Sequence, residues 1–345
     1  MILLDAKLKS LMGTTGGVPS ALQLALQLEL TTIPPYLYAL YSIRPGTNPA
    51  IESRLKSIVI EEMLHMTLVC NLLNAIGGSP VLNTATVVPT YPGPLPGSVA
   101  GGLIVPLRPF SKDLVRTVFM VIEEPEMPIP VSAATAIPEV AMTIGQFYAG
   151  IKETLRKQTF AADPARQVRP ADVFGFFPDD ELIPVTDFAS ASAAIDVIVE
   201  QGEGTTKSVN DQDGDLAHFY AFLEILNDKT LGQNPLVQPD DPLDRQFIFT
   251  GDLPPFDPTG VRPLLENPRA AQYPAGSAAA VANDDFNKTY TGLLLSLHAA
   301  FNGAPAEIGG TLGKMNGLRQ QALTVMDIAL PDGTHAGPSF EFVAH

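Results

Sequence analysis

The sequence predicts an all-α fold, a four-helix bundle with a long crossover, extra C-terminal helices and long Pro/Gly-rich loops. Three observations predict this class. Apolar residues recur at helical spacing along several long segments. Stretches rich in proline and glycine separate these segments, and some are longer than the connection of a simple helix pair. Two segments place an acidic residue three positions before a histidine. We expect one domain over residues 1–345.

The composition is that of a globular protein, with 46% hydrophobic and 17% charged residues. The sequence has 37 acidic and 21 basic residues, so its formal charge is −16. We therefore expect neither nucleic acid nor a membrane as partner. No uninterrupted apolar stretch approaches the ~20 residues of a membrane span, and the first residues lack a secretory pattern. We therefore expect a cytoplasmic protein. The single cysteine, Cys70, is interpreted as a small buried hydrophobe.

The first bundle helix is predicted over 19–43. Glu29 is the only charged residue in that segment, and it shares one stripe with apolar side chains, which directs its carboxylate into the bundle. The other members of this stripe are Leu22, Leu26 and Ile33. Pro34 and Pro35 remove two amide donors, so the helix is expected to kink or break after Glu29. An equally good interpretation is that one helix ends there and another starts at Tyr36.

The second bundle helix is predicted over 51–76, and it carries Glu62 and His65 on one apolar face. A buried ionised carboxylate is destabilising unless it is paired or coordinates a cation. Glu-x-x-His on an inward helix face is also the spacing that carboxylate-bridged di-metal sites use in helical bundles. The pairing alternative needs a nearby base, but Arg54 lies roughly two turns from Glu62.

The crossover is predicted over 79–109, with a helix at 111–124 that Ser111 caps and Pro125 ends. The third bundle helix is predicted over 138–157, with Gln146 near its middle. A short helix follows at 190–200.

The fourth bundle helix is predicted over 213–226, where Asp215 and His218 repeat the three-residue spacing. The next segment, 228–277, is expected to wrap over the bundle or form a lid, with a short strand at 247–250. The additional C-terminal helices are expected at 278–301 and 304–330.

Together these segments supply a candidate metal-binding set, which is Glu29, Glu62, His65, Gln146, Asp215 and His218. In the usual set each of two helices gives a Glu and each of the other two gives Glu-x-x-His. Glutamine in place of glutamate removes one negative charge, and aspartate shortens the reach by one methylene. Three negative charges then face two divalent ions, so we expect an asymmetric site that holds one ion or two of unequal affinity. Glu203 is a candidate for the missing charge.

The chain resembles the ferritin-like domain shared with the violacein-type iminophenyl-pyruvate dimer synthases. The motifs that carry this resemblance are Leu28-Glu29-Leu30, Ile33-Pro34-Pro35-Tyr36-Leu37, Glu61-Glu62-Met63-Leu64-His65-Met66, Asn74-Ala75-Ile76-Gly77-Gly78, Thr143-Ile144-Gly145-Gln146-Phe147-Tyr148, Gln201-Gly202-Glu203-Gly204, Leu216-Ala217-His218-Phe219-Tyr220-Ala221-Phe222, Phe286-Asn287-Lys288-Thr289-Tyr290 and Gly337-Pro338-Ser339-Phe340-Glu341-Phe342.

The resemblance implies a ferritin-like four-helix bundle with non-haem iron and the oxidative coupling of amino-acid-derived imines. By position, four residues match the ligands expected for the family, namely Glu29, Glu62, His65 and His218. Gln146 and Asp215 stand where the family usually has Glu.

The leading hypothesis is an O2-dependent non-haem iron oxidase or oxygenase that acts on a small aromatic or amino-acid-derived molecule in secondary metabolism. It would hold one or two Fe ions, with Mn or Zn as alternatives, and it would be a metal-dependent oxidoreductase. Tyr36, Tyr148 and Tyr220 are candidate pocket or radical residues, although packing explains them equally well. The alternative is a ferritin-like metal-binding or structural protein with a degenerate centre and no catalysis. A homo-oligomer is a further expectation.

Overall fold

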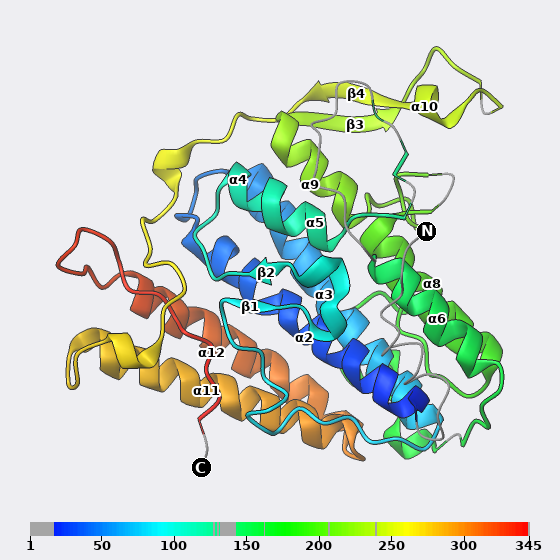
Figure 1. Ribbon diagram of the computed structural model, residues 1–345, viewed down its shortest axis with the longest axis horizontal. Coiled ribbons are helices and arrows are strands. Elements are labelled where there is room, and N and C mark those ends of the chain that lie inside the picture. The colour runs from blue at the N-terminus through cyan, green and yellow to red at the C-terminus, as the bar shows by residue number, and fades with distance from the viewer. Residues whose placement is uncertain are drawn as a thin grey trace.

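The computed structural model describes residues 17–126, 128–129, 131, 143–161, 163–205, 208–238 and 240–343. These residues are mainly helical, which confirms the all-α class. The helices α2 (Gly17–Ser42) and α3 (Pro49–Ala75) lie in the middle of the molecule. The pair α11 (Ala278–Phe301) and α12 (Ile308–Met326) lies on one side of them, and α6 (Ile144–Leu155), α8 (Phe188–Glu203) and α9 (His218–Asn227) lie on the other (Figure 1). The side chains between these helices form the hydrophobic core.

The α2 helix runs from Gly17 to Ser42 without a break at Pro34 and Pro35, so the expected break is wrong. A proline lacks the N–H that would bond the carbonyl four residues earlier, and Pro35 therefore frees the carbonyl of Thr31. The hydroxyl of Tyr91, on the crossover, donates to that carbonyl over 2.8 Å. A tertiary contact thus replaces the helical hydrogen bond, and the helix continues.

The α3 helix, Pro49–Ala75, begins with a proline at its first turn and ends at the predicted glycine pair. Gly77 has a φ of 78°, and the N–H groups of Gly77 and Gly78 bond the carbonyls of Asn74 and Leu73. By length and mean hydropathy α3 would suit a membrane span, but 83% of its most apolar window is buried inside the protein. The packed core therefore accounts for its apolar character.

The crossover contains a short antiparallel pair of strands, β1 (Gly93–Pro94) and β2 (Ile104–Val105), with η1 (Pro96–Gly102) between them. A continuous helical segment then follows as α4 (Lys112–Leu114), the π-helical turn η2 (Val115–Phe119) and α5 (Met120–Ile122). Ser111 accepts the N–H of Leu114 over 3.0 Å, which confirms the predicted cap. This segment packs against α9, so it forms a wall of the bundle.

The helices of the next region begin and end at positions different from the predicted ones. The third predicted helix is α6 (Ile144–Leu155), and residues 138–142 of that prediction lie outside the described residues. The fourth is α9 (His218–Asn227), which begins five residues later than predicted. Between them lie η3 (Pro164–Arg166), α7 (Pro170–Val173) and α8 (Phe188–Glu203).

The 228–277 region wraps over one end of the bundle. Its strands β3 (Lys229–Gln233) and β4 (Phe247–Asp252) form an antiparallel hairpin, which contains the predicted short strand. Backbone hydrogen bonds join this region to the end of α2, as in Arg262 N–H to Ser42 O over 2.8 Å. The remaining short helices here are α10 (Leu243–Gln246), η4 (Pro258–Gly260) and η5 (Ala270–Gln272).

The C-terminal helices α11 (Ala278–Phe301) and α12 (Ile308–Met326), joined through η6 (Pro305–Glu307), pack against each other and against α2 and α3. The last segment of the chain is fastened along α11. Asn283 and Asn287 both donate to the Ser339 hydroxyl, over 3.0 and 2.9 Å. Two of the resemblance motifs therefore have a structural role in this contact.

Candidate metal centre

Five buried polar residues meet where α2, α3, the end of α5 and the start of α9 come together. Their side chains are between 0% and 4% exposed. The members are Glu29, Glu62, His65, Glu123 and His218. Within the described part of the chain none of them forms an ion pair with a lysine or arginine, and Arg54 instead pairs with Glu224. Simple charge pairing with a base therefore does not explain why these acids are buried.

The five residues divide into two groups that share one carboxylate. Glu29, Glu62 and His65 form the first group, and Glu62, Glu123 and His218 form the second. In each group one ligand atom per residue lies within 4.8 Å of the others. Glu62 would therefore be a ligand of an ion held by either group.

The separations between these atoms suit metal ligands better than hydrogen bonds. His65 Nδ1 lies 3.6 Å from Glu62 Oε1 and 3.7 Å from Glu29 Oε2. His218 Nδ1 lies 3.2 Å from Glu62 Oε1 and 3.6 Å from Glu123 Oε2, and it has no hydrogen-bond partner among the described residues. Two atoms that each lie ~2.1 Å from one ion are roughly 3.0–3.5 Å apart. The geometry therefore fits an ion in each group.

The other nitrogen of each imidazole has a partner that sets its protonation. His65 Nε2 lies 2.9 Å from Gln201 Oε1, and His218 Nε2 lies 2.8 Å from Glu61 Oε2. Both oxygens accept, so each Nε2 carries a hydrogen, and in the neutral imidazole each Nδ1 is left with its lone pair directed at the cluster. This is the arrangement that metal-bound histidines use.

A hydroxyl holds the outer oxygen of every carboxylate. Tyr148 donates to Oε1 of Glu29, Thr32 donates to Oε2 of Glu62, and Tyr36 donates to Oε1 of Glu123. In each case the remaining oxygen faces a histidine. The hydroxyls therefore orient the acids toward the two metal positions.

The members of the cluster shift one another's pKa values when no metal is present. Burial alone would raise the pKa of Glu62, but the neighbouring imidazoles of His218 and His65 outweigh it and lower that pKa to about 2. Burial opposes the charge on His65, yet its carboxylate partners raise its pKa to about 10, and the pKa of His218 is raised for the same reason. Burial, reinforced by the Glu62 charge, raises the pKa of Glu29 and of Glu123.

Four of the six predicted ligands come together, and two do not. Gln146 is the third residue of α6, and its side chain accepts from the N–H of Thr143 over 3.3 Å as part of a capping box. Asp215 is exposed in the loop before α9. The three-residue spacing to His218 brings two side chains together only inside a helix, and α9 starts at His218 itself.

Sequence reasoning missed Glu123, Glu61 and Gln201. Glu123 follows α5, in a segment that the sequence suggested was only a connection. The signal that could have found it is an acid at the end of an apolar helical stretch. Glu61 precedes Glu62 in the opening motif, and Gln201 belongs to the Gln-Gly-Glu-Gly motif.

The other candidate residues lie near the cluster without belonging to its two groups. Glu203 accepts from the N–H of Gly145 over 2.5 Å, and burial raises its pKa to about 8. The Tyr220 hydroxyl accepts from the N–H of Ile129 over 2.9 Å. Of the three candidate tyrosines, Tyr36 and Tyr148 therefore contact the cluster directly, and Tyr220 supports the backbone.

The fold and the cluster define a helical-bundle protein with a buried carboxylate–histidine centre. The family model for ferritin-like proteins matches residues 22–227, a range that contains all five cluster residues. The chain belongs to the ferritin-like family, which confirms the expected fold.

Two known proteins are similar to this chain. The dichlorochromopyrrolate synthase of Lentzea aerocolonigenes is 25% identical over 332 residues, which cover 86% of this chain and 30% of that protein. The chain thus spans about three-tenths of the length of this relative. The crystal structure of a ferritin-like protein from Caulobacter vibrioides superposes with a TM-score of 0.61 at 24% identity, covering 94% of this chain and 98% of the other. At this level of identity, the similarity to the Caulobacter vibrioides protein shows a shared fold.

Proposed function

We propose that this chain is a non-haem metal oxidoreductase that uses O2 and acts on a small aromatic or amino-acid-derived molecule in secondary metabolism. The observation that carries the proposal is the pair of carboxylate–histidine groups that share Glu62, with both Nδ1 atoms directed at carboxylate oxygens. The similarity to a dichlorochromopyrrolate synthase supports the substrate class.

The donor set favours iron, with manganese or zinc as alternatives. Glu29, Glu62 and His65 would hold one ion, and Glu62, Glu123 and His218 would hold the other. Carboxylates and imidazoles together suit redox-active first-row metals, and the arrangement of two such groups in a bundle is that of di-iron carboxylate proteins. Iron held by these residues would supply the electrons for O2 chemistry.

The charge of the site favours two divalent ions over one. Glu29, Glu62 and Glu123 supply three negative charges, and Glu61, on the far side of His218, supplies a fourth. Four negative charges balance two divalent cations when both histidines are neutral. The sequence had predicted only three negative charges for two divalent ions, because Gln146 is uncharged. With Glu123 and Glu61 counted in place of Gln146 and Asp215, the charges balance.

The surrounding side chains would orient the ligands and hold protons at defined atoms. Burial, then the charges of Glu123 and Glu29 respectively, raise the pKa values of Tyr36 and Tyr148, so both hydroxyls stay protonated and keep donating to the outer oxygens. We propose these two tyrosines as the residues that exchange a proton or an electron with the centre, since each contacts a ligand.

We further propose that the partners are a small-molecule substrate and O2, with no nucleic acid and no membrane, since the net charge is −16. A cytoplasmic location, a homo-oligomer and a single domain over residues 1–345 remain predictions.

Metal analysis of matched variants tests the proposal. We expect about two iron ions per chain after anaerobic loading of the wild-type protein. Glu62→Ala should lose both, because this carboxylate belongs to both groups, and Glu123→Ala should lose one. Asp215→Ala is the matched control, and it should bind as the wild type does because Asp215 is exposed outside the cluster.

Oxygen uptake by the loaded protein then separates the proposal from its alternative. Consumption of O2 that is absent in Glu62→Ala supports the oxidoreductase. Binding of iron without O2 consumption supports a ferritin-like metal-binding protein with no catalysis. Near-zero iron, manganese and zinc, unchanged by Glu62→Ala, would contradict any metal-dependent function.

A further inference from the structure

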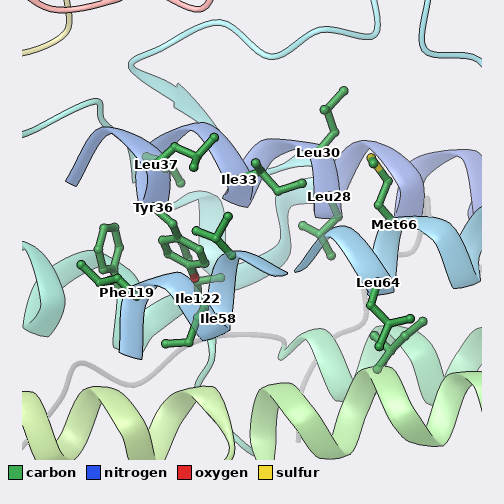
Figure 2. Close-up of a cluster of buried hydrophobic side chains, with 14 of the residues drawn as sticks. Leu28, Leu30, Ile33, Tyr36, Leu37, Ile58, Leu64, Met66, Phe119 and Ile122 are labelled. Carbon is green, nitrogen blue, oxygen red and sulfur yellow. The ribbon is translucent and has the colours of Figure 1, made fainter. Parts of the chain in front are cut away.

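A cavity lies on the side of the α2–α3 pair opposite to the carboxylate–histidine cluster, between these helices and the C-terminal pair α11–α12. It has a volume of about 80 Å³. Its walls include Leu30 and Ile33 from α2 and Met63 and Met66 from α3, which alternate along the chain with metal-centre residues. Figure 2 shows Leu30 leaving α2 on the side opposite to Tyr36, which points toward Phe119 and Ile122.

Tyr290 of α11 lines this cavity, and its hydroxyl is unpaired among the described residues. The residue is 4% exposed. Its ring is held in place by two buried aromatic rings, Phe286 at 6.4 Å and Phe340 at 5.3 Å between centroids. A buried hydroxyl without a partner is destabilising by roughly 1–3 kcal/mol. The site therefore lacks one hydrogen-bonding group.

The two threonines of the cavity already have acceptors. Thr67 donates to the carbonyl of Met63 over 2.8 Å, and Thr311 donates to the carbonyl of Ile308 over 2.5 Å. The rest of the wall is apolar apart from the hydroxyl of Tyr41, and it includes the thioethers of Met63, Met66 and Met315 and the rings of Phe176 and Phe177. Flexible thioethers make favourable contacts with aromatic rings and adapt to their shape. These walls therefore favour a ring over an aliphatic chain.

We propose that this cavity binds a small aromatic molecule with one hydrogen-bonding substituent, whose ring packs among the methionines and whose polar group pairs with the Tyr290 hydroxyl. An apolar cavity of about 150 Å³ admits benzene. The present cavity is smaller, but its mobile methionine side chains allow it to expand around a single ring.

A route to the solvent adjoins the cavity. A surface hollow of about 310 Å³ shares Leu37, Tyr41, Met63, Phe176 and Met315 with its wall. Because the two spaces have these side chains in common, a ligand passes from the hollow into the cavity by rotation of side chains, without movement of a helix. The methionines are the most flexible of the shared residues.

Calorimetric titration of the metal-free full chain with phenol and with toluene tests the proposal. The two probes have the same size, and only phenol has a group that pairs with Tyr290. We expect both to bind the wild-type protein. Tyr290→Phe should weaken phenol binding by about two- to tenfold and leave toluene binding unchanged or stronger. Leu297→Phe, which fills the cavity from α11, should abolish binding of both.

Stability measurements provide a readout that does not depend on ligand. Because Tyr290→Phe removes an unpaired hydroxyl, the ligand-free variant should unfold at the same temperature as the wild type or at a higher one. A lower unfolding temperature would show that the hydroxyl already has a partner and would overturn the proposal. Failure of both probes to bind the wild-type protein, or an equal loss of phenol and toluene in Tyr290→Phe, would also overturn it. Neither result bears on metal binding, since the protein is metal-free.

Discussion

Glu62 is the residue that both groups of the carboxylate–histidine cluster share. Its Oε1 atom faces both histidines, while Thr32 holds its Oε2 atom. The two histidine contacts keep its pKa at about 2, although burial acts in the opposite direction. A single carboxylate thus remains ionised at full burial because two imidazoles share its charge.

Glu61 acts on the centre through His218, and this can be tested with a conservative change. Its carboxylate accepts from Nε2 of His218, and it is the fourth negative charge near the cluster. Removal of such a partner typically weakens metal binding by about 10–100-fold. We expect Glu61→Gln to weaken the Glu123–His218 position by about tenfold or more and to change the Glu29–His65 position less. Metal titration by calorimetry measures both affinities, and equal weakening of the two would contradict this assignment.

Glu203 predicts a pH dependence of folding. Burial raises its pKa from 4.5 to about 8 in the folded protein. A carboxyl with a raised pKa stabilises the fold fully below about pH 4.5, and that contribution is lost as the pH rises through 8. Glu203→Gln stays neutral, so it should become more stable than the wild type by roughly 1–3 kcal/mol at pH 9, with little difference at pH 5.

Chemical denaturation of both proteins at the two pH values measures this difference. Asp196, a partly exposed acid on the same helix that pairs with Lys152, provides the control, and Asp196→Asn should show no comparable dependence on pH. A Glu203→Gln variant that gains nothing between pH 5 and pH 9 would show that Glu203 is ionised in the folded protein.

At the scale of elements, α2 shows how a contact from a distant segment preserves a helix. Pro34 and Pro35 lie inside it, yet Glu29 and Tyr36, on either side of the prolines, both reach the metal centre. If α2 were broken at the prolines, the positions of Glu29 and Tyr36 relative to each other would no longer be fixed by one helix. The Tyr91 hydroxyl prevents this by bonding the carbonyl of Thr31.

Tyr91→Phe should therefore destabilise the protein by about 1–3 kcal/mol, since it leaves a buried carbonyl without its partner. We also expect weaker metal binding, because Glu29 lies two residues before that carbonyl. Thermal unfolding and metal titration measure the two effects. Tyr273→Phe is a suitable control, since its hydroxyl bonds Gly337 in the C-terminal segment, so that it should lower stability without changing metal affinity.

At the scale of the whole molecule, the proposed metal binding should be coupled to folding through protons. Although burial acts in the opposite direction, carboxylate neighbours raise the pKa of His65 to about 10 and also raise that of His218, so both imidazoles hold protons without metal. Burial raises the pKa of Glu29 and of Glu123. The two metal positions require all four groups in their deprotonated forms. Ions and protons therefore compete for the same atoms, and metal affinity should fall as the pH falls.

Loading with two divalent ions at pH 7 should release about two protons per chain from His65 and His218, and it should raise the unfolding temperature. Calorimetry in two buffers of different ionisation enthalpy counts the protons, and Glu62→Ala provides the blank. Metal uptake with no proton release would contradict the protonation state described for the metal-free cluster. A chelator should reverse the gain in stability.

Much of the fold follows from local patterns that act within one segment. The helical spacing of apolar residues predicts α2, α3 and α11 to within about two residues, and the glycine pair predicts the end of α3. The same patterns show that Glu29, Glu62 and His65 lie on inward faces. His218 was predicted from its spacing to Asp215 and from the resemblance motif around it. The spacing was misleading, because no helix contains both residues.

The sequence by itself determined a helical bundle and four buried residues of one centre. Only the tertiary structure decided that Glu123 completes the second group and that Gln146 and Asp215 do not. The physical reason is that a ligand set depends on where helices start and how they pack against one another. The capping of α6 by Thr143, the start of α9 at His218 and the packing of α5 on α9 bring together atoms that no spacing within a single helix relates.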